Sequence, residues 1–288
     1  MRRDKRWLVG FDRRSLVSLA AGLTMVGLLG GTLAAKPPGD EAVPRDPPHL
    51  AAALDAPLLI GHFTTVYPQS APDRNYNMAR AVAAIRGTVV PNGGEFSFNA
   101  VVGNASRERG YRKGRVFVGD RIVEDYGGGV CQVATTVYNA ALRAGLTVLE
   151  RHQHGLTVPY LPPGEDATIS YGALDLRLRN DTNGPIFFWG EAEGGRVTID
   201  IYGTRPGPEV WFRHKILRRI PFRVIEIPSE ELAPSERRLI APGQEGVTVA
   251  TWLMRRYGEG PVETTDLGVF TYRPSPRIYL VGVRRPSA

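Results

Sequence analysis

The chain has a single cysteine, Cys131, in 288 residues, so it cannot form an internal disulfide. It also lacks a basic patch interleaved with aromatic residues, which speaks against a nucleic-acid partner. The formal net charge is +7, but six basic and two acidic side chains fall within residues 1–14, which leaves the remainder only mildly basic. A disulfide-stapled fold is therefore excluded, and nucleic acid is not an expected ligand.

The N-terminal segment has the pattern of an export signal. The basic residues 1–14 precede an uncharged apolar run from Ser15 to Ala35. This run is also long enough to cross a bilayer as an uncleaved anchor. We therefore expect residues 1–35 to be a signal peptide or a membrane anchor, with membrane contact through residues 15–35 if uncleaved. Both forms place the rest of the chain outside the cytoplasm, secreted to the cell envelope or anchored there.

The remaining chain divides by composition into three parts. Residues 36–57 are rich in proline and indicate an extended linker. Residues 58–205 form the main domain, and residues 206–288 form a linker and a β-rich module. For the main domain we expect an α+β fold, in which a central helix carrying Cys131 packs on an antiparallel sheet, followed by a small all-β module.

Cys131 lies between a glycine run and a helical pattern. Gly127 to Gly129 allow a sharp turn, and apolar residues recur at helical spacing from Val133 to Ala144. A thiol at a helix start faces the positive end of the peptide dipoles, which favours the thiolate. A backbone N–H near Cys131 could then hold an oxyanion, with Gly129 and Gln132 as oxyanion or loop support. The alternative is that Cys131 is only a small buried hydrophobic residue.

Histidines and acids follow the cysteine in an order that suits nucleophilic acyl transfer. His152 and His154 follow a strand-like stretch, and Asp166 lies in a turn before another. A thiolate needs an imidazole to take and return protons, and the imidazole needs a carboxylate to fix its tautomer. We predict Cys131 as nucleophile, His154 as general base and Asp166 as the orienting acid.

Spacing alone leaves alternatives open at two of these positions. His152 could replace His154, and Asp175 or Glu165 could replace Asp166. A different alternative is metal ligation by the two histidines with Asp166 or Asp175. No third histidine lies nearby, and we expect neither a metal nor a cofactor.

Several stretches resemble the VanW-like family, which is named after a component of vancomycin-resistance operons. The resemblance covers roughly residues 58 to 203. It is carried by Asn75–Ala79, Pro91–Asn99, Val102–Gly103, Arg107–Tyr111, Gly127–Gln132, Glu150–His154 and Gly164–Gly172. It implies an identity for the main domain but no reaction.

Two shorter resemblances concern chemistry and binding. The Gly129–Cys131 run with the later histidine is similar to the core of transglutaminase-like and papain-like thiol enzymes. The C-terminal module resembles the five-glycine surface module in Ile220–Phe222, Pro242–Gly246 and Pro276–Gly282. That module implies affinity for wall glycans, and a spacer role is the alternative.

Two functions follow from these observations. The first is an exported cell-envelope enzyme that uses a thiol for acyl transfer or amide hydrolysis on cell-wall peptide. The second is a non-catalytic scaffold that binds peptidoglycan. In both cases the expected partners are peptidoglycan or anionic wall polymers.

Overall fold

The computed structural model describes residues 54–283 except residues 70 and 119–120. The predicted signal peptide or anchor at 1–35, its apolar run at 15–35 and nearly all of the linker at 36–57 lie outside the described residues. Among the helices within the described ranges, none is long and apolar enough to cross a membrane.

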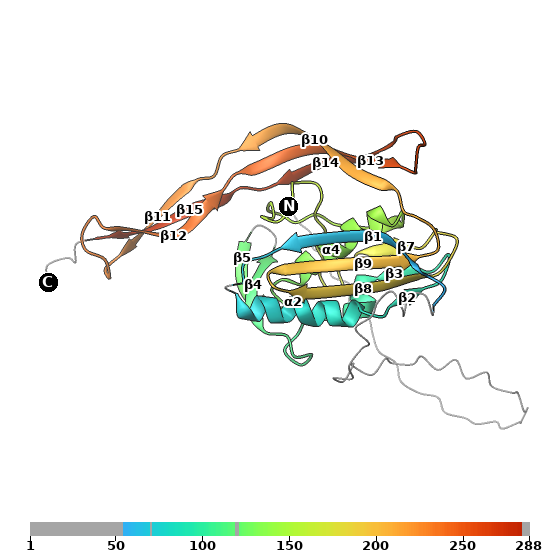
Figure 1. The fold of residues 1–288 in the computed structure, drawn as a ribbon. Helices are drawn as coiled ribbons and strands as arrows, with labels where there is room; N and C mark the ends of the chain where they lie inside the picture. Colours follow the sequence, from blue (N-terminus) through green and yellow to red (C-terminus); the bar gives the residue numbers. More distant parts are fainter. Residues whose placement is uncertain (1–53, 70, 119–120, 284–288) are drawn as a thin grey trace, which may run out of the picture. The chain divides into compact units, whose positions relative to one another are not determined.

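Strands predominate in the described residues, of which 46% lie in strands and 15% in helices (Figure 1). The helices of this part of the chain are α2 (Pro72–Ile85), α3 (Phe98–Val102) and α4 (Val130–Arg143). The first nine strands are β1 (Leu58–Val66), β2 (Val89–Val90), β3 (Glu95–Ser97), β4 (Lys113–Val118), β5 (Arg121–Tyr126), β6 (Thr147–Glu150), β7 (Arg177–Arg179), β8 (Ile186–Glu193) and β9 (Arg196–Gly203). The strands that follow are β10 (Glu209–Ile220), β11 (Val224–Ser229), β12 (Arg237–Gln244), β13 (Gly246–Arg256), β14 (Glu263–Tyr272) and β15 (Ser275–Gly282).

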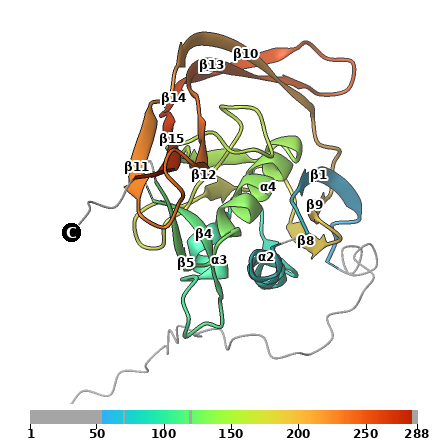
Figure 2. The ribbon, with the colours of Figure 1, turned by 90° about the vertical axis from the view of Figure 1, so that its left-hand side faces the viewer.

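The central sheet has four antiparallel strands in the order β1-β9-β8-β2. Helix α4 packs against β1 and β9, whereas α2 packs against β8 and also contacts α4. Figure 2 shows both helices on one side of this sheet. The sheet and the two helices form a layered unit that fixes the direction of α4.

The hydrophobic core lies between this sheet and its helices. Successive side chains of a strand lie on opposite faces, so alternate residues such as Ile199 and Ile201 of β9 point into the core and are fully buried. Helix α4 contributes an apolar face at helical spacing. Its fully buried residues include Val133, Val137, Ala140 and Ala141.

The described strands also form four smaller sheets. The strand orders are β3-β7-β6, β4-β5, β10-β13-β14 and β11-β15-β12. Strands β11 and β15 are parallel, and the other pairs in these sheets are antiparallel. The sheet β10-β13-β14 is the one that reaches the candidate site described below.

The prediction of an α+β fold with one helix on one antiparallel sheet is wrong. The described strands form five sheets, and the described chain is mostly β. The strand-like stretch predicted after Asp166, residues 168–171, forms only isolated bridges. Hydrophobic periodicity indicates where short strands lie between Gly, Pro and Asn turns. It does not specify which strands pair with one another, and so it does not specify the number of sheets. The expected transglutaminase-like or papain-like core was part of this prediction and is wrong with it.

Helix α4 approaches β1 closely at a glycine. A Cβ built on Gly61 would clash with the carbonyl oxygen of Ala140 and would lie 2.8 Å from the Cβ of Ala144. Any larger residue must push the strand and the helix apart, because a backbone oxygen cannot rotate away as a side chain can. Gly61 therefore sets the distance between the sheet and the helix that carries Cys131.

We expect Gly61→Ala to lower the free energy of unfolding by about 1–3 kcal/mol, because it overpacks the contact between β1 and α4. Urea denaturation of the purified protein measures this change. The control is Leu59→Ala in the same strand, where the exposed side chain predicts a change within about 0.5 kcal/mol. Equal stabilities for the two variants would contradict the close approach at Gly61.

Candidate functional site

A glycine turn places Cys131 at the start of helix α4. Gly129 has a φ of 103°, in the left-handed region that favours glycine, and a Cβ there would lie 2.8 Å from the Met78 side chain. The Val130 N–H donates to the Gly127 carbonyl at 3.0 Å, which closes the turn. Cys131 is therefore the second residue of α4, where the helix dipole favours a negative charge.

The same face of α4 that carries Cys131 also holds the segment with the acid. Residues 131, 135 and 139 lie four positions apart and share one side of the helix. The Thr135 hydroxyl donates to the Ala167 carbonyl at 2.8 Å and accepts from the Ala167 N–H at 3.0 Å. The Asn139 amide donates to the Glu165 carbonyl at 2.9 Å. These buried hydrogen bonds fix the backbone on both sides of Asp166.

The histidine segment lies beside the acid segment. The Thr168 N–H donates to the His152 carbonyl at 2.8 Å, and these two residues form an antiparallel bridge. The His154 backbone N–H donates to Asp166 Oδ2 at 2.7 Å. The backbone itself therefore brings His154 and Asp166 together before their side chains interact.

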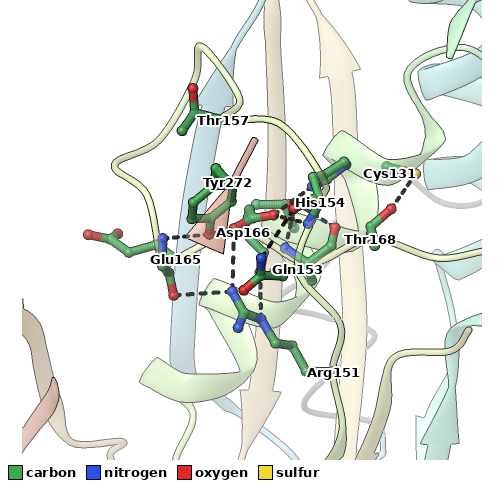
Figure 3. A network of polar contacts seen from close by, with 12 residues as sticks. Cys131, Arg151, Gln153, His154, Thr157, Glu165, Asp166, Thr168 and Tyr272 are labelled. Atoms are coloured by element: carbon green, nitrogen blue, oxygen red, sulfur yellow. Dashed lines mark hydrogen bonds and ion pairs between the residues drawn. The ribbon is translucent and has the colours of Figure 1, made fainter. Parts of the chain in front are cut away.

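His154 and Asp166 form a buried hydrogen-bonded pair (Figure 3). His154 Nδ1 lies 2.6 Å from Asp166 Oδ2, and the two residues are 2% and 0% exposed. Burial alone would lower the pKa of His154, but hydrogen bonds and charges of Asp166 and Cys131 outweigh it and raise this pKa to about 9. The imidazole is thus held in its protonated form at neutral pH.

Cys131 is partly exposed and faces this pair. Its Sγ atom lies 3.5 Å from Thr168 Oγ1 and 3.7 Å from the Ile169 carbonyl oxygen, and the thiol also hydrogen-bonds His154. Burial raises the pKa of the thiol, but the hydrogen bond and charge of His154, with smaller help from Ile169 and Thr168, lower it to about 7. The two shifts together favour a thiolate beside an imidazolium near neutral pH.

Asp166 has two further partners that sequence reasoning missed. The Tyr272 hydroxyl donates to Asp166 Oδ1 at 2.5 Å. Arg151 donates through Nε to the Asp166 carbonyl at 2.6 Å, and its Nη2 lies 3.4 Å from Oδ1. Burial raises the pKa of Asp166, but His154, Arg151 and Tyr272 together lower it, so the carboxylate stays ionised. Arg151 adjoins the histidines in sequence, whereas nothing in the sequence points to Tyr272.

The alternative residues have other partners. His152 Nε2 lies 2.9 Å from Glu150 Oε1. Asp175 accepts from the Ser97 hydroxyl at 2.5 Å and from the Asn99 N–H at 2.9 Å. Glu165 Oε1 lies 3.1 Å from His214 Nε2 of β10. The geometry brings together Cys131, His154 and Asp166 and leaves these alternatives outside the group.

The Gln132 side chain holds the start of α4, next to the glycine turn, against the end of β1. Its Nε2 donates to Thr65 Oγ1 at 3.0 Å and to the Val66 carbonyl at 3.1 Å, both at the end of β1. Its Oε1 accepts from Arg74 Nη2 at 2.7 Å. The side chain is almost fully buried, so its amide is committed to tying α4 to β1 and to Arg74.

A cavity of about 330 Å³ opens beside the thiol. Its lining includes Cys131, His154, Arg74, Tyr160, Arg115 and Asp125. The cavity is large enough for part of a peptide and gives a substrate access to the thiol. Within the described ranges, no group of three or more histidine, cysteine or acidic side chains has the arrangement of a metal site.

The comparisons with known proteins identify relatives of the main domain. Residues 73–202 match the family model described as VanW like protein, which confirms the predicted resemblance. The uncharacterized protein YoaR of Bacillus subtilis (strain 168) is 37% identical over 171 residues, covering 59% of this chain and 54% of YoaR. The vancomycin B-type resistance protein VanW of Enterococcus faecalis (strain ATCC 700802 / V583) is 26% identical over 150 residues, covering 50% of this chain and 53% of that protein. The chain thus spans about half the length of the curated relatives it matches.

Two solved structures of G5 domains also match part of the chain. The IgA1 protease G5 domain is 24% identical and covers 29% of this chain and 100% of its own, with a TM-score of 0.19. The HP0197 G5 domain is 18% identical and covers 26% of this chain and 99% of its own, with a TM-score of 0.16. At these scores the likeness gives no information on ligand binding.

We expect the alkylation rate of Cys131 by iodoacetamide to rise with pH around an apparent pKa of about 7. His154→Gln removes the hydrogen bond and positive charge that favour the thiolate but leaves the burial that opposes it. The apparent pKa should then rise above the free-thiol value of about 8.5. The measurement is the rate of alkylation between pH 5 and pH 10, followed by mass spectrometry.

The matched control is His152→Gln, because the His152 ring contacts Glu150. This variant should keep the apparent pKa of the unaltered protein. A thiol that reacts only after unfolding, or a His154→Gln variant with an unchanged pKa, would contradict the assigned contact between Cys131 and His154.

Proposed function

We propose that this chain, which carries a VanW-like domain over residues 73–202, is an extracytoplasmic thiol enzyme of the cell envelope that cleaves or exchanges amide bonds in cell-wall peptide. The observation that carries the proposal is the buried His154–Asp166 pair, with Nδ1 2.6 Å from Oδ2, in contact with a thiol whose pKa is lowered to about 7. A thiolate, an imidazolium and an orienting carboxylate are the parts that acyl transfer requires.

In the first step, the Cys131 thiolate attacks the carbonyl carbon of the substrate amide. A carbon–sulfur bond forms, and the carbonyl electrons move to the oxygen. When the tetrahedral species collapses, the carbon–nitrogen bond breaks, and the His154 imidazolium gives its proton to the leaving amine. The product of this step is a thioester on Cys131 and a neutral His154.

In the second step, water or an amine attacks the thioester carbon. His154 takes the proton of the attacking group, and the carbon–sulfur bond breaks to restore the thiolate and the imidazolium. Water as the acceptor gives hydrolysis, and an amine gives a new amide bond. Asp166 remains ionised in both steps and holds the imidazole so that its other nitrogen faces the sulfur.

The negative oxygen of the tetrahedral species needs hydrogen-bond donors. The N–H groups of Val130 and Gln132 already donate to the carbonyls of Gly127 and Gly129, at 3.0 and 2.9 Å. We assign the role of oxyanion donor to the N–H of Cys131 itself, in the first turn of α4. Gly129 supports this donor by allowing the turn that precedes it.

The cell envelope is the proposed place of action for two reasons. The sequence predicts an export segment at residues 1–35. One relative bears the name of a vancomycin B-type resistance protein, which supports a connection with the cell wall. Peptidoglycan and anionic wall polymers are accordingly the proposed partners.

A non-catalytic, wall-binding scaffold is the second candidate. Of the two predicted functions, the comparisons agree better with this one, because they support a cell-envelope protein and name no reaction. In such a scaffold the glycine turn and Cys131 would serve only packing. The two candidates differ in whether the thiol is required for any change in the wall peptide.

We expect the purified protein to release amine-bearing fragments from isolated peptidoglycan, or to attach an added amine, and Cys131→Ala to abolish this activity. Mass spectrometry of the soluble fragments detects the products. Acid quenching during turnover should also trap the acyl group on Cys131, seen as a mass increase of the protein.

The control is the binding of both proteins to the same peptidoglycan in a sedimentation assay, where Cys131→Ala should bind as the unaltered protein does. Binding without products, and without a trapped acyl group, across a panel of wall peptides would reject the enzyme and support the scaffold.

A further inference from the structure

Strand β14, which lies outside the VanW match, ends beside the candidate site. The match ends at residue 202, whereas Tyr272 is the last residue of β14. Tyr272 is fully buried, and its hydroxyl donates to Asp166 Oδ1 at 2.5 Å and accepts from the Gly164 N–H at 2.7 Å. Its hydroxyl therefore links the carboxylate to the backbone of the loop that carries it.

The residues before and after Tyr272 in the sequence hydrogen-bond to the segment that carries His154. The Gln153 side chain donates to the Thr271 carbonyl at 2.8 Å, and the Arg273 N–H donates to the Gly155 carbonyl at 2.7 Å. The residues on either side of His154 are thus bonded to the residues on either side of Tyr272. Three consecutive residues of the strand end hold both the histidine and the acid segments.

The two oxygens of Asp166 have different partners. Oδ2 accepts from the backbone N–H of His154 and lies against its Nδ1, whereas Oδ1 has Tyr272 at 2.5 Å and Arg151 at 3.4 Å. The terminal torsion of an aspartate is broad, so the carboxylate can turn unless both oxygens are held. Tyr272 is the close donor that fixes the oxygen facing away from the histidine.

On this basis we propose that Tyr272 is a positioning residue, supplied by the C-terminal sheet, which orients Asp166 so that His154 keeps the Cys131 thiol ionised. The proposal rests on the proposed thiol function. It makes the sheet β10-β13-β14 part of the reactive centre, through the contact between Tyr272 and Asp166.

The test is Tyr272→Phe, which removes only the hydroxyl, with the pH dependence of Cys131 alkylation as readout. We expect the apparent pKa of the thiol to rise by about one unit, which lowers the thiolate fraction at pH 6 about tenfold. Tyr257→Phe is the matched control, because Tyr257 is an exposed tyrosine that does not line the cavity, and its loss should leave the thiol pKa unchanged. Thermal unfolding of both variants monitors stability separately.

A double variant tests whether Tyr272 acts through Asp166. In an Asp166→Asn background, Tyr272→Phe should cause no further change in the thiol pKa. If Tyr272→Phe lowers the melting temperature but leaves the thiol pKa unchanged or lower, while His154→Gln raises it, Tyr272 is structural only and the positioning role is overturned. If His154→Gln also leaves the pKa unchanged, the thiol function itself fails.

A separate observation concerns the charge of the cavity. Arg74, in the first turn of α2, lines the cavity beside Cys131 and hydrogen-bonds the neutral Gln132 side chain. In the described part of the chain it forms no ion pair with a carboxylate. Burial lowers the pKa of Arg74, partly offset by the nearby Tyr160, Cys131 and Tyr67, but an arginine stays charged in any such site.

The other charges of the cavity balance. By formal charge, the Cys131 thiolate and the His154 imidazolium cancel, and so do Arg115 and Asp125, which also line the cavity. Arg74 therefore leaves an excess positive charge close to the nucleophile. A partly desolvated guanidinium with spare donors binds a carboxylate well, because both groups present paired planar contacts.

We further infer that the Cys131 cavity takes acyl substrates with a free carboxylate close to the scissile carbonyl, held by Arg74. This inference also rests on the proposed thiol function and names its substrate class. Two small alkylating reagents test it without a natural substrate. Iodoacetate carries a carboxylate, whereas iodoacetamide is neutral, and both consume the same thiolate, so their rate ratio is independent of the thiol pKa.

We expect Arg74→Gln to lower the ratio of the iodoacetate rate to the iodoacetamide rate by roughly tenfold. This is the change expected when one charge-assisted hydrogen bond to the carboxylate of iodoacetate is lost. Arg80→Gln, on the same helix but outside the cavity lining, should keep the ratio of the unaltered protein. An unchanged ratio in Arg74→Gln overturns the carboxylate site. A folded protein that reacts with neither reagent overturns the thiol function instead.

Discussion

The candidate site depends on one buried charge, the carboxylate of Asp166. An ionised carboxylate with no exposure is costly unless it is paired and hydrogen-bonded. Its partners come from two parts of the chain: His154 and Arg151 in the segment after β6, and Tyr272 at the end of β14. Removing one partner of a buried pair commonly costs about 3–5 kcal/mol, so the same contacts that make the histidine basic also hold these segments together.

One face of α4 places the Cys131 thiol close to the pair formed by His154 and Asp166. Thr135 and Asn139 bind the acid segment, and Cys131 lies one turn before Thr135. Gly61 lets β1 approach the helix, and Gln132 ties the first turn of the helix to the end of that strand. The position of the thiol is thus set by the central sheet, whereas the position of its base and acid is set by hydrogen bonds from α4 and from β14.

The sequence predicted that Cys131, His154 and Asp166 lie together, but it did not predict how the strands pair. The glycine run before an apolar helical pattern indicated where Cys131 lies, because both signals are local. Spacing left His152 open as an alternative to His154, because the bridge between His152 and Thr168 that decides between them in the structure is not specified by alternation. Tyr272 is 106 residues from Asp166, and no local pattern marks such a contact. The α+β prediction failed for a similar reason, since strand pairing across five sheets is a long-range property.

The composition of the site bears on the choice between an enzyme and a scaffold. Asp166, His154 and Arg151 form a buried polar group. Replacing such a group with well-packed apolar side chains of similar volume often leaves the stability of a protein unchanged or raises it, so fold stability alone does not account for the group. A scaffold would gain nothing from lowering the pKa of Cys131 to about 7 in a cavity open to a ligand. An acyl-transfer enzyme needs both features at once, because its nucleophile must be ionised at neutral pH and reachable by the substrate. The proposed enzyme accounts for the energetic cost of this group, and in that proposal wall binding by the same chain brings the thiol to its substrate.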